Sequence, residues 1–521
     1  MLSVKRIRNR DYHVDLARED YYLEGGEPPG WWHGTGATQL GLASQVSKEE
    51  LHHIMDGFSP DGSFKLVQNA GTDTREIGWD YTFSAPKTVS TEWSQAGPKK
   101  RAAIQHIHNA AVRKTLDFLE QKATTRRGKG GVNKEPVKLV AALFEHATSR
   151  ELQPQLHTHA LLMNLGCRTD GTTGTIQISE LLKEKMLLGA LYRAELAQQL
   201  RDQLGYEIGP HLQGKDALFD LKGVSFELVE AFSKRREAIA ERLREKGYSS
   251  AVAAAVAALD TREPKTNIPP RENLFAAWQE MGQALGYKSP RPKFVQLESA
   301  LAQKEVAEKA VTDLLQRSSS FSQNTLLRRV AELAPHYGLD IEALQEAVTH
   351  RLTQADIFSL GQIQGEQHYS TTTLFLQHQA AVTTLDVSQI AQAAGLQRQG
   401  YQVLGIAPGK SALRLQNETA IKSYSLHRFL GKLRDCHVRL DKKTLVVVKG
   451  MEHIPSQQLA AVMEQADGKK ALLALVTDQP EHRATASPPK SPTKTPSTPV
   501  IETLELTTPN QAKSRNPHLE R

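Results

Sequence analysis

The chain has 521 residues, and its 65 lysines and arginines outnumber its 58 aspartates and glutamates, which gives a formal net charge of +7 at pH 7. This length suggests about three domains. The positive excess weakly favours a polyanionic partner, because a solvated basic surface is the commoner explanation for so small an excess. No apolar run reaches the roughly 18 residues of a membrane span, and two distant cysteines do not suggest a disulfide framework, so a cytoplasmic protein without membrane insertion is expected.

The first part of the chain, residues 1–290, mixes strand and helix patterns and predicts an α/β domain. A strand runs into a proline-containing turn over 78–91, and amphipathic helices are expected over 179–205 and 227–247. The pattern over 291–368 is helical throughout, which predicts a helical connector.

The pattern returns to α/β over 369–480, where the apolar runs GYQVLGIAP, KTLVVVKGM and ALLALVTD predict strands of a second, smaller domain. The remaining residues, 481–521, are rich in Pro, Ser, Thr and Lys and poor in large apolar side chains. Such a segment buries too little apolar surface to fold, so a disordered tail is expected.

Three histidines lie in the stretch EHATSRELQPQLHTHALLMN. The apolar runs 137–147 and 156–164 predict an antiparallel hairpin, in which His146 would lie opposite His157. His159 would point to the same face, because strand side chains alternate. Opposed Cβ atoms are roughly 4.5–5.5 Å apart, so three imidazoles could converge on one metal ion. The alternative is a pair of half-buried polar residues on an exposed strand face.

The segment KATTRRGKGGVNK, residues 122–134, places five lysines and arginines among three glycines. Cations and free backbone N–H groups together suit phosphate binding, although a flexible surface turn would look the same. Upstream, Trp31 and Trp32 could stack on unpaired bases, and the alternative for either one is core packing.

Four motifs agree with one known family. The stretches DYYLEGGEPPGWWHGTGATQLGL, GWDYTFSAPKTVS and TTRRGKGGV, together with the histidine hairpin, resemble the MobF class of conjugative relaxases, the relaxase-helicases that nick plasmid DNA at an origin of transfer. The resemblance covers roughly residues 1–290. It implies a palm-like antiparallel sheet of the HUH type with helices behind it, a histidine-bound divalent metal, and a tyrosine nucleophile.

Carried over to this sequence, the resemblance implies that His146, His157 and His159 are the metal ligands and that Asp80 is their acidic partner or that of the tyrosine. Where the family usually has an Asp before the hairpin proline, this chain has Gln153. Imidazole ligands favour Zn, Cu or Ni by affinity, whereas phosphoryl chemistry commonly uses Mg or Mn, so the ion stays open.

Two groups of tyrosines near the start could supply the nucleophile. The family carries two tyrosine clusters, and register makes Tyr12 the match to the first, with His13 in the place of its second tyrosine. Tyr21 and Tyr22 match the second cluster. A tyrosine hydroxyl has a pKa of about 10 and needs a neighbouring base or cation, a role that Asp80 could fill unless it orients a histidine or caps a turn. The cations expected on DNA phosphates are Lys87, Arg126, Arg127, Lys129 and Arg150.

The second domain contains GIAPGKS, residues 405–411, which resembles a phosphate-binding loop but has only three residues between Gly405 and Gly409 instead of four. The wider stretch is similar to the segment that follows the P-loop in the family's helicase domain. Where such helicases carry an Asp-Glu pair, the strand KTLVVVKGM ends in Lys449 and Gly450. A degenerate helicase domain without ATPase activity is therefore expected.

The leading hypothesis is a metal-dependent transesterase that nicks single-stranded DNA at an origin of transfer through a 5′-phosphotyrosine. The alternatives are a rolling-circle replication initiator, a non-catalytic DNA-binding or docking protein, and a zinc hydrolase of small molecules. The resemblance also implies a bacterial cytoplasmic location, translocation with the DNA, a type IV secretion coupling protein and accessory DNA-binding proteins as partners.

Overall fold

The computed structural model describes residues 2–8, 27–42, 44–149, 151–211, 217–233, 269–295, 297–318, 320–363, 366–371, 382–386, 400–435, 437–441, 443–450 and 471–477, with positions 397, 462, 465, 466 and 469. The predicted tail over 481–521 and the predicted helix beyond residue 233 lie outside these residues.

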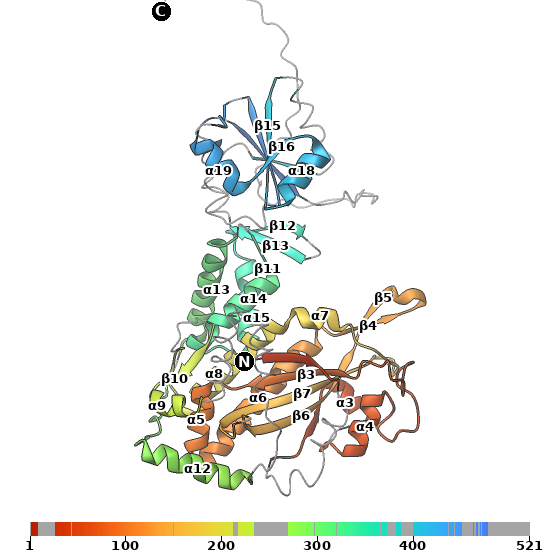
Figure 1. Cartoon of the computed structure of the whole chain (residues 1–521), viewed down its shortest axis with the longest axis vertical. Coiled ribbons are helices and arrows are strands. Elements are labelled where there is room, and N and C mark those ends of the chain that lie inside the picture. Colours follow the sequence, from red (N-terminus) through yellow and green to blue (C-terminus); the bar gives the residue numbers. More distant parts are fainter. Residues whose placement is uncertain are drawn as a thin grey trace, which may run out of the picture. The chain divides into compact units, whose positions relative to one another are not determined.

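The first sheet has the order β1-β3-β7-β6-β2, every neighbouring pair is antiparallel, and β8 pairs with the end of β7 (Figure 1). Its strands are β1 (Leu2–Arg6), β2 (Trp31–His33), β3 (Gly78–Ser84), β6 (Lys138–Thr148), β7 (Pro154–Cys167) and β8 (Thr173–Gly174). The antiparallel sheet expected of the first domain is confirmed, and β6 and β7 are its long central hairpin.

Alternating side chains divide the sheet between two cores. Tyr81, Phe83 and Leu162 belong to the larger core, which also contains residues of α5, α6 and α8. Phe144 and Met163 belong to the smaller core, with residues of α3 and α4. The helices of this region are α3 (Thr35–Gln39), α4 (Lys48–Asp56), α5 (Lys87–Gln95), α6 (Pro98–Glu120), α7 (Ile178–Lys183), α8 (Lys185–Leu204), α9 (Phe226–Ala231) and α12 (Arg271–Ala284).

Two of these elements depart from the expected pattern. The single helix expected over 179–205 is divided at Glu184 into α7 and α8, and α8 ends at Gly205 in the left-handed conformation that glycine adopts without strain. The basic segment over 122–134 is not a plain turn, because it contains the paired strands β4 (Thr124–Arg127) and β5 (Asn133–Pro136) around η2 (Lys129–Gly131). A short antiparallel pair, β9 (Ile208–Pro210) and β10 (Phe219–Leu221), follows α8.

The segment after residue 291 is helical as expected, and it shares a core with α8. Its elements are α13 (Ser299–Leu315), β11 (Phe321–Ser322), α14 (Gln323–Leu333), η3 (Ala334–His336), α15 (Ile341–Leu352), β12 (Ile357–Ile363) and β13 (Glu366–Thr371). Leu326 and Leu344 lie in the same buried cluster as Leu196 of α8. The three-stranded sheet β11-β13-β12 at its end was not anticipated from the sequence.

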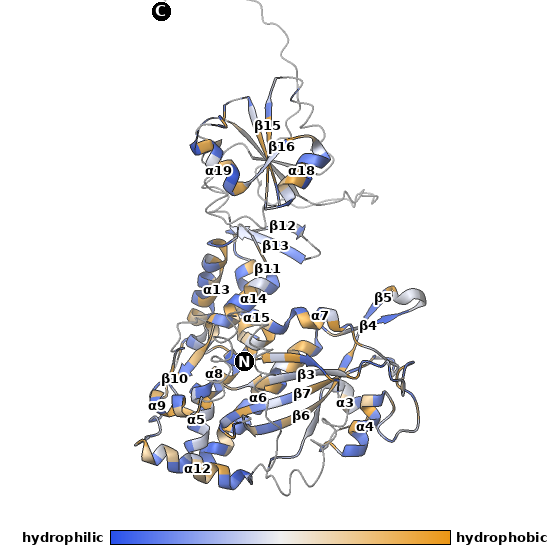
Figure 2. Cartoon of the chain, viewed as in Figure 1, coloured by the Kyte–Doolittle hydropathy of each residue, from blue (hydrophilic) through white to orange (hydrophobic). Residues whose placement is uncertain are grey.

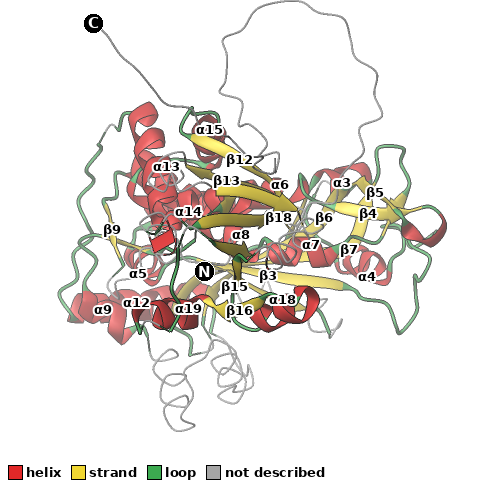
Figure 3. Ribbon diagram, turned by 90° about the horizontal axis from the view of Figure 1, so that it is seen from above, coloured by secondary structure: helices red, strands yellow, loops and turns green. Residues whose placement is uncertain are grey.

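The second sheet has the order β14-β18-β17-β15-β16 and all its pairs are parallel. It consists of β14 (Val382–Asp386), β15 (Gln402–Ala407), β16 (Lys422–Ser425), β17 (Thr444–Lys449) and β18 (Leu472–Thr477), with α18 (Ser411–Thr419) and α19 (Leu426–Arg434) beside it (Figures 1 and 3). The expected second α/β domain is therefore present. Among the described helices, none is long and apolar enough to cross a bilayer.

One buried tyrosine gives a test of the larger core. The Tyr81 hydroxyl is fully buried and has no hydrogen-bond partner among the described residues, and burial raises the pKa of this group. Tyr81→Phe removes an unsatisfied group, so we expect thermal unfolding at the same or a higher temperature, with a gain of about 1 kcal/mol. Its neighbour on the same face provides the contrast, since Phe83→Ala leaves a cavity and should cost about 3–5 kcal/mol. A lower unfolding temperature for Tyr81→Phe would mean that the hydroxyl is hydrogen-bonded.

Candidate metal centre and DNA-facing residues

The hairpin of β6 and β7 brings the three histidines together. His146 pairs directly with His157, as expected, and His159 lies two residues further along the same face. One ring nitrogen from each histidine lies within 4.8 Å of the other two, and the ring centroids are 5.0 to 5.4 Å apart. Strand pairing continues further toward the turn than expected, since closure was expected between Ala147 and Leu156 and Thr148 still pairs with Pro154.

Two of the rings are held through their Nδ1 atoms. His159 Nδ1 lies 2.8 Å from the Asp80 carboxylate, and His157 Nδ1 lies 2.7 Å from the Gln155 carbonyl oxygen. A metal-bound histidine typically gives its second nitrogen to such an acceptor, which fixes the tautomer and directs Nε2 to the ion. The donor set therefore fits a divalent ion bound by three imidazoles, with positions left for oxygen ligands.

Asp80 is placed to orient a ligand. It is buried on β3, whose Thr82 lies opposite His159, and Thr82 also donates a hydrogen bond to Asp80 at 3.2 Å. These contacts correspond to the expectation that Asp80 orients a histidine. The alternative of a cap on the following turn does not match them.

Two hydrogen bonds from other parts of the chain hold the hairpin turn in place. Leu152 has a φ of 52°, a strained value for a residue other than glycine, and its carbonyl accepts a hydrogen bond from Trp278 at 3.0 Å. Gln153, where the family usually has Asp, donates to the Ala231 carbonyl of α9 at 3.2 Å. Gln153 therefore connects the turn to α9, and the three histidines lie together with glutamine at this position.

The expected phosphate-binding cations are not equivalent. Arg126 lines a pocket of about 840 Å³ with Lys65 and Arg168. Arg127 lines the same pocket, but it pairs with Asp170 at 2.7 Å and with Glu135 at 3.3 Å, which raises its pKa. The side chain of Lys129 and all of Arg150 lie outside the described residues.

Lys87 begins α5 and has a local structural partner. Its ammonium donates to the Pro154 carbonyl at the start of β7 at 2.8 Å, and burial lowers its pKa to about 8. Trp31 and Trp32 also differ, since 46% of Trp31 is exposed whereas Trp32 is 8% exposed and packs in the smaller core. Only Trp31 is available to stack on a base.

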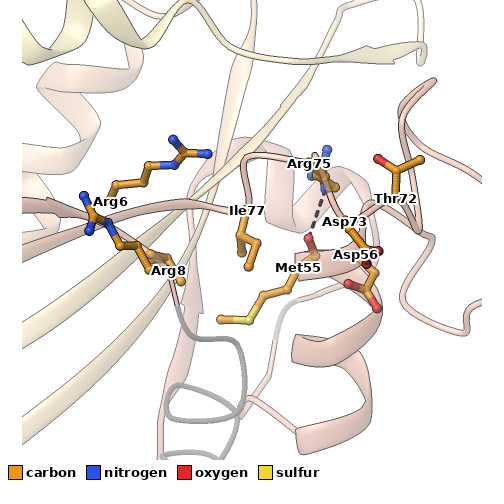
Figure 4. Close-up of a pocket in the computed structure, with 9 residues that line it drawn as sticks. Arg6, Arg8, Met55, Asp56, Thr72, Asp73, Arg75 and Ile77 are labelled. Carbon is orange, nitrogen blue, oxygen red and sulfur yellow. Dashed lines mark hydrogen bonds between the residues drawn. The ribbon is translucent and has the colours of Figure 1, made fainter.

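The predicted nucleophiles Tyr12, Tyr21 and Tyr22 lie outside the described residues, which resume at Glu27. Close by in sequence, Arg8 ends the preceding described segment and lines a pocket of about 500 Å³ with Arg6, Arg75 and two aspartates. Figure 4 shows Arg6 and Arg8 on one side of the pocket and Arg75 on the other. Arg75 donates a hydrogen bond to the Met55 carbonyl at 3.0 Å. None of the predicted site residues lines this pocket.

Sequence reasoning missed the residues behind the histidines. Glu145 and Thr158 form the cross-strand pair on the opposite face and are buried among polar side chains of α6 and α12. The available signal was a glutamate and a threonine at inward positions of otherwise apolar strands.

In the second sheet, GIAPGKS forms the end of β15, a turn and the start of α18. The first strand of this sheet is β14, and the chain that follows it reads VSQIAQAAG, without a phosphate-binding loop motif. At the end of β17, Lys449 lies 3.5 Å from the Glu418 carboxylate.

Comparisons with known proteins agree on the first domain. The sequence model of the TrwC relaxase family matches residues 7–285, and that of an AAA domain matches residues 384–493. The multifunctional conjugation protein TraI of Escherichia coli (strain K12) is 30% identical over an alignment of 398 residues that covers 70% of this chain. The chain spans 22% of the length of the curated relatives it matches.

Solved structures of the conjugative relaxase TrwC in complex with oriT DNA are also similar. The metal-free form is 33% identical, with a TM-score of 0.49 over 55% of this chain and 100% of the other. The metal-bound form is 34% identical, with a TM-score of 0.49 over 56% of this chain and 100% of the other. Since the family model covers more than half of the 521 residues, this chain belongs to the TrwC relaxase family.

Proposed function

We propose that the protein is a metal-dependent, site- and strand-specific DNA transesterase that nicks single-stranded DNA at an origin of transfer and initiates conjugative transfer. The observation that carries the proposal is the convergence of three imidazoles on one face of the hairpin, with Asp80 on His159. Family membership and the names of the similar proteins, a conjugation protein and a relaxase bound to oriT DNA, support it.

In this proposal His146, His157 and His159 hold the divalent ion, and Asp80 acts through His159 as a positioning residue. An ion held there would supply Lewis-acid chemistry toward a phosphate oxygen. The tyrosine oxygen forms a bond to phosphorus while the bond from phosphorus to the 3′ oxygen breaks. The phenol proton passes to water, the departing 3′ oxygen takes a proton from water and leaves as a 3′-hydroxyl, and the 5′ side stays on the protein as a phosphotyrosine. Mg or Mn is proposed as the working ion, with Zn or Ni as competitors.

The proposed DNA contacts take into account which of the expected cations already bind a carboxylate or carbonyl group. Arg126, together with Lys129 and Arg150, would bind backbone phosphates, and such contacts supply most of the affinity for DNA. Arg127 reaches a phosphate only by leaving Asp170. To bind a phosphate, Lys87 would have to break its hydrogen bond with the Pro154 carbonyl. We therefore propose that Lys87 holds the start of β7 in place.

The remaining assignments are proposals as well. We divide the chain into a relaxase domain over 1–290, a helical connector over 291–368, a degenerate helicase-like domain over 369–480 and a disordered tail over 481–521. A cytoplasmic protein that passes to the recipient with its DNA would also need a type IV secretion coupling protein, and accessory DNA-binding proteins at the origin.

The test of the metal centre is His157→Ala. Incubation of the unchanged protein with a library of single-stranded DNA and Mn²⁺ or Mg²⁺, followed by sequencing of covalently attached DNA, should give the cleavage sequence. With an oligonucleotide of that sequence, His157→Ala should lose metal-dependent cleavage by at least about 100-fold and bind the DNA within about threefold of the unchanged protein, because phosphate contacts dominate affinity. Undiminished cleavage would contradict the metal assignment.

The nucleophile is tested by the tyrosines. Tyr12→Phe should eliminate the covalent 5′-phosphotyrosyl adduct, because phenylalanine lacks the attacking oxygen, while Tyr21→Phe and Tyr22→Phe should retain first-strand cleavage. Peptide mapping of the adduct provides the measurement. An adduct on Tyr21 or Tyr22 would move the nucleophile to the second cluster.

The helicase-like domain is proposed to lack ATPase activity, because no phosphate-binding motif follows β14 and Lys449 ends β17 beside Glu418. Purified protein should show no DNA-stimulated ATP hydrolysis above the blank. Lys410→Ala is the matched control for GIAPGKS. A turnover signal that this variant abolished would make that segment a working phosphate loop.

A further inference from the structure

Behind the three histidines, the hairpin buries a polar layer. Glu145 and Thr158 pair across the strands and are 6% and 1% exposed. Glu145 precedes His146, and Thr158 stands between His157 and His159. Because strand side chains alternate, this pair points away from the histidines and toward α6.

One turn of α6 satisfies most of this layer. Gln105 and Asn109 donate to the two Glu145 oxygens at 2.6 and 2.7 Å. Thr158 bonds to Asn109 at 3.2 Å and to His108 at 2.9 Å. Burial lowers the pKa of His108 to about 3, so its imidazole is neutral at neutral pH.

The last partner comes from much further along the chain. Arg271, the first residue of α12, bonds through Nη2 to Glu145 at 2.9 Å and through Nη1 to Glu27 at 2.9 Å. The second oxygen of Glu27 accepts the backbone N–H of Ala147 at 2.8 Å. The planar guanidinium thus joins Glu27 to Glu145, a geometry that suits the fork of arginine and not the point charge of lysine. Because Glu27 also accepts from Ala147, residue 27 is connected to both neighbours of His146.

The helix that presents Arg271 is itself firmly held. Phe275 and Trp278 pack their rings on Trp93 of α5, with centroids 4.8 and 6.1 Å apart. The Trp278 carbonyl accepts from Gln95 at 2.7 Å, and its indole N–H reaches Leu152 in the hairpin turn. Figures 1 and 3 show α12 beside α5, and Figure 2 shows that α12 carries both hydrophobic and hydrophilic residues.

We propose that Arg271 and Glu27 are positioning residues for the nicking reaction: they fasten the chain that follows the tyrosines to the strand that carries His146, and so keep nucleophile and metal in one relative placement. The inference rests on the proposed function. Glu27 comes five residues after Tyr22, so the tie acts on the part of the chain that leads back to the tyrosines. Glu27 contacts the strand through the Ala147 backbone N–H, and Arg271 contacts it through the Glu145 carboxylate, so the expected effect is on placement and not on ligation.

Two single variants, made in the whole 521-residue chain, test the contacts of Glu27 and Arg271. Glu27→Gln keeps a carbonyl oxygen for the Ala147 N–H but removes the charge that holds Arg271, and Arg271→Lys keeps the charge but loses the fork. With the cleavage-sequence oligonucleotide and Mn²⁺ both saturating, each variant should form the adduct roughly 10- to 100-fold more slowly, because small misplacements of reacting groups are costly. The dissociation constants for Mn²⁺ and for the oligonucleotide should stay within about threefold.

A double variant and a matched control exclude a general loss of stability. If both residues act through one ion pair, E27Q/R271K should be no slower than the slower single variant. Asp313→Asn breaks another partly buried arginine–carboxylate pair, with Arg329 on α14, and should leave the adduct rate unchanged.

The outcomes separate the two proposals. If the unchanged protein forms no adduct, the proposed function fails. If it does, an unchanged rate in E27Q overturns the inference, as does a loss of Mn²⁺ affinity in proportion to the rate or an additive loss in the double variant. Should Arg271→Lys fail to fold, E27Q decides, since it leaves every donor to Glu145 in place.

Discussion

The pairing register of β6 and β7 is the constraint on which the rest of the site depends. With His146 opposite His157, all three imidazoles lie on one face, and Glu145 and Thr158 lie on the other. A slip of β6 by one residue would turn His146 toward α6 and bring the Glu145 carboxylate to the histidine face. A slip of β7 would turn His157 and His159 away in the same manner. The register therefore decides which side chains can bind a metal and which buried polar groups need hydrogen-bond partners in the core.

The buried polar residues behind the hairpin favour this register energetically. A buried carboxylate that loses its partner costs about 3–5 kcal/mol, so only the observed alignment, in which Gln105, Asn109 and Arg271 all reach Glu145, avoids a heavy penalty. Apolar pairs at these positions would tolerate small shifts more easily. The same alignment that satisfies Glu145 sets the spacing of the histidines on the opposite face.

Local pattern was enough to predict the hairpin and the shared face of the histidines, because side-chain alternation is a property of each strand alone. The antiparallel class of the sheet came from the resemblance to the relaxase family. It could not predict that Arg271 meets Glu27, since these residues are 244 positions apart. Lys87 illustrates a related limit: its sequence neighbours suggested an open cation, whereas burial and the Pro154 carbonyl are consequences of tertiary packing. Hydrophobic periodicity also failed to predict two other features. These are the division of the expected long helix at Glu184 and the short sheet β11-β13-β12.

The packing of the second sheet does not depend on a bound nucleotide. Its parallel strands and flanking helices are held by buried Val, Leu and Ile side chains such as Val446, Val448 and Ile406. At the end of β17, Lys449 lies 3.5 Å from the Glu418 carboxylate and so places a positive charge at that strand end. The packing of the domain and the proposed loss of a magnesium site are compatible, because they involve different residues.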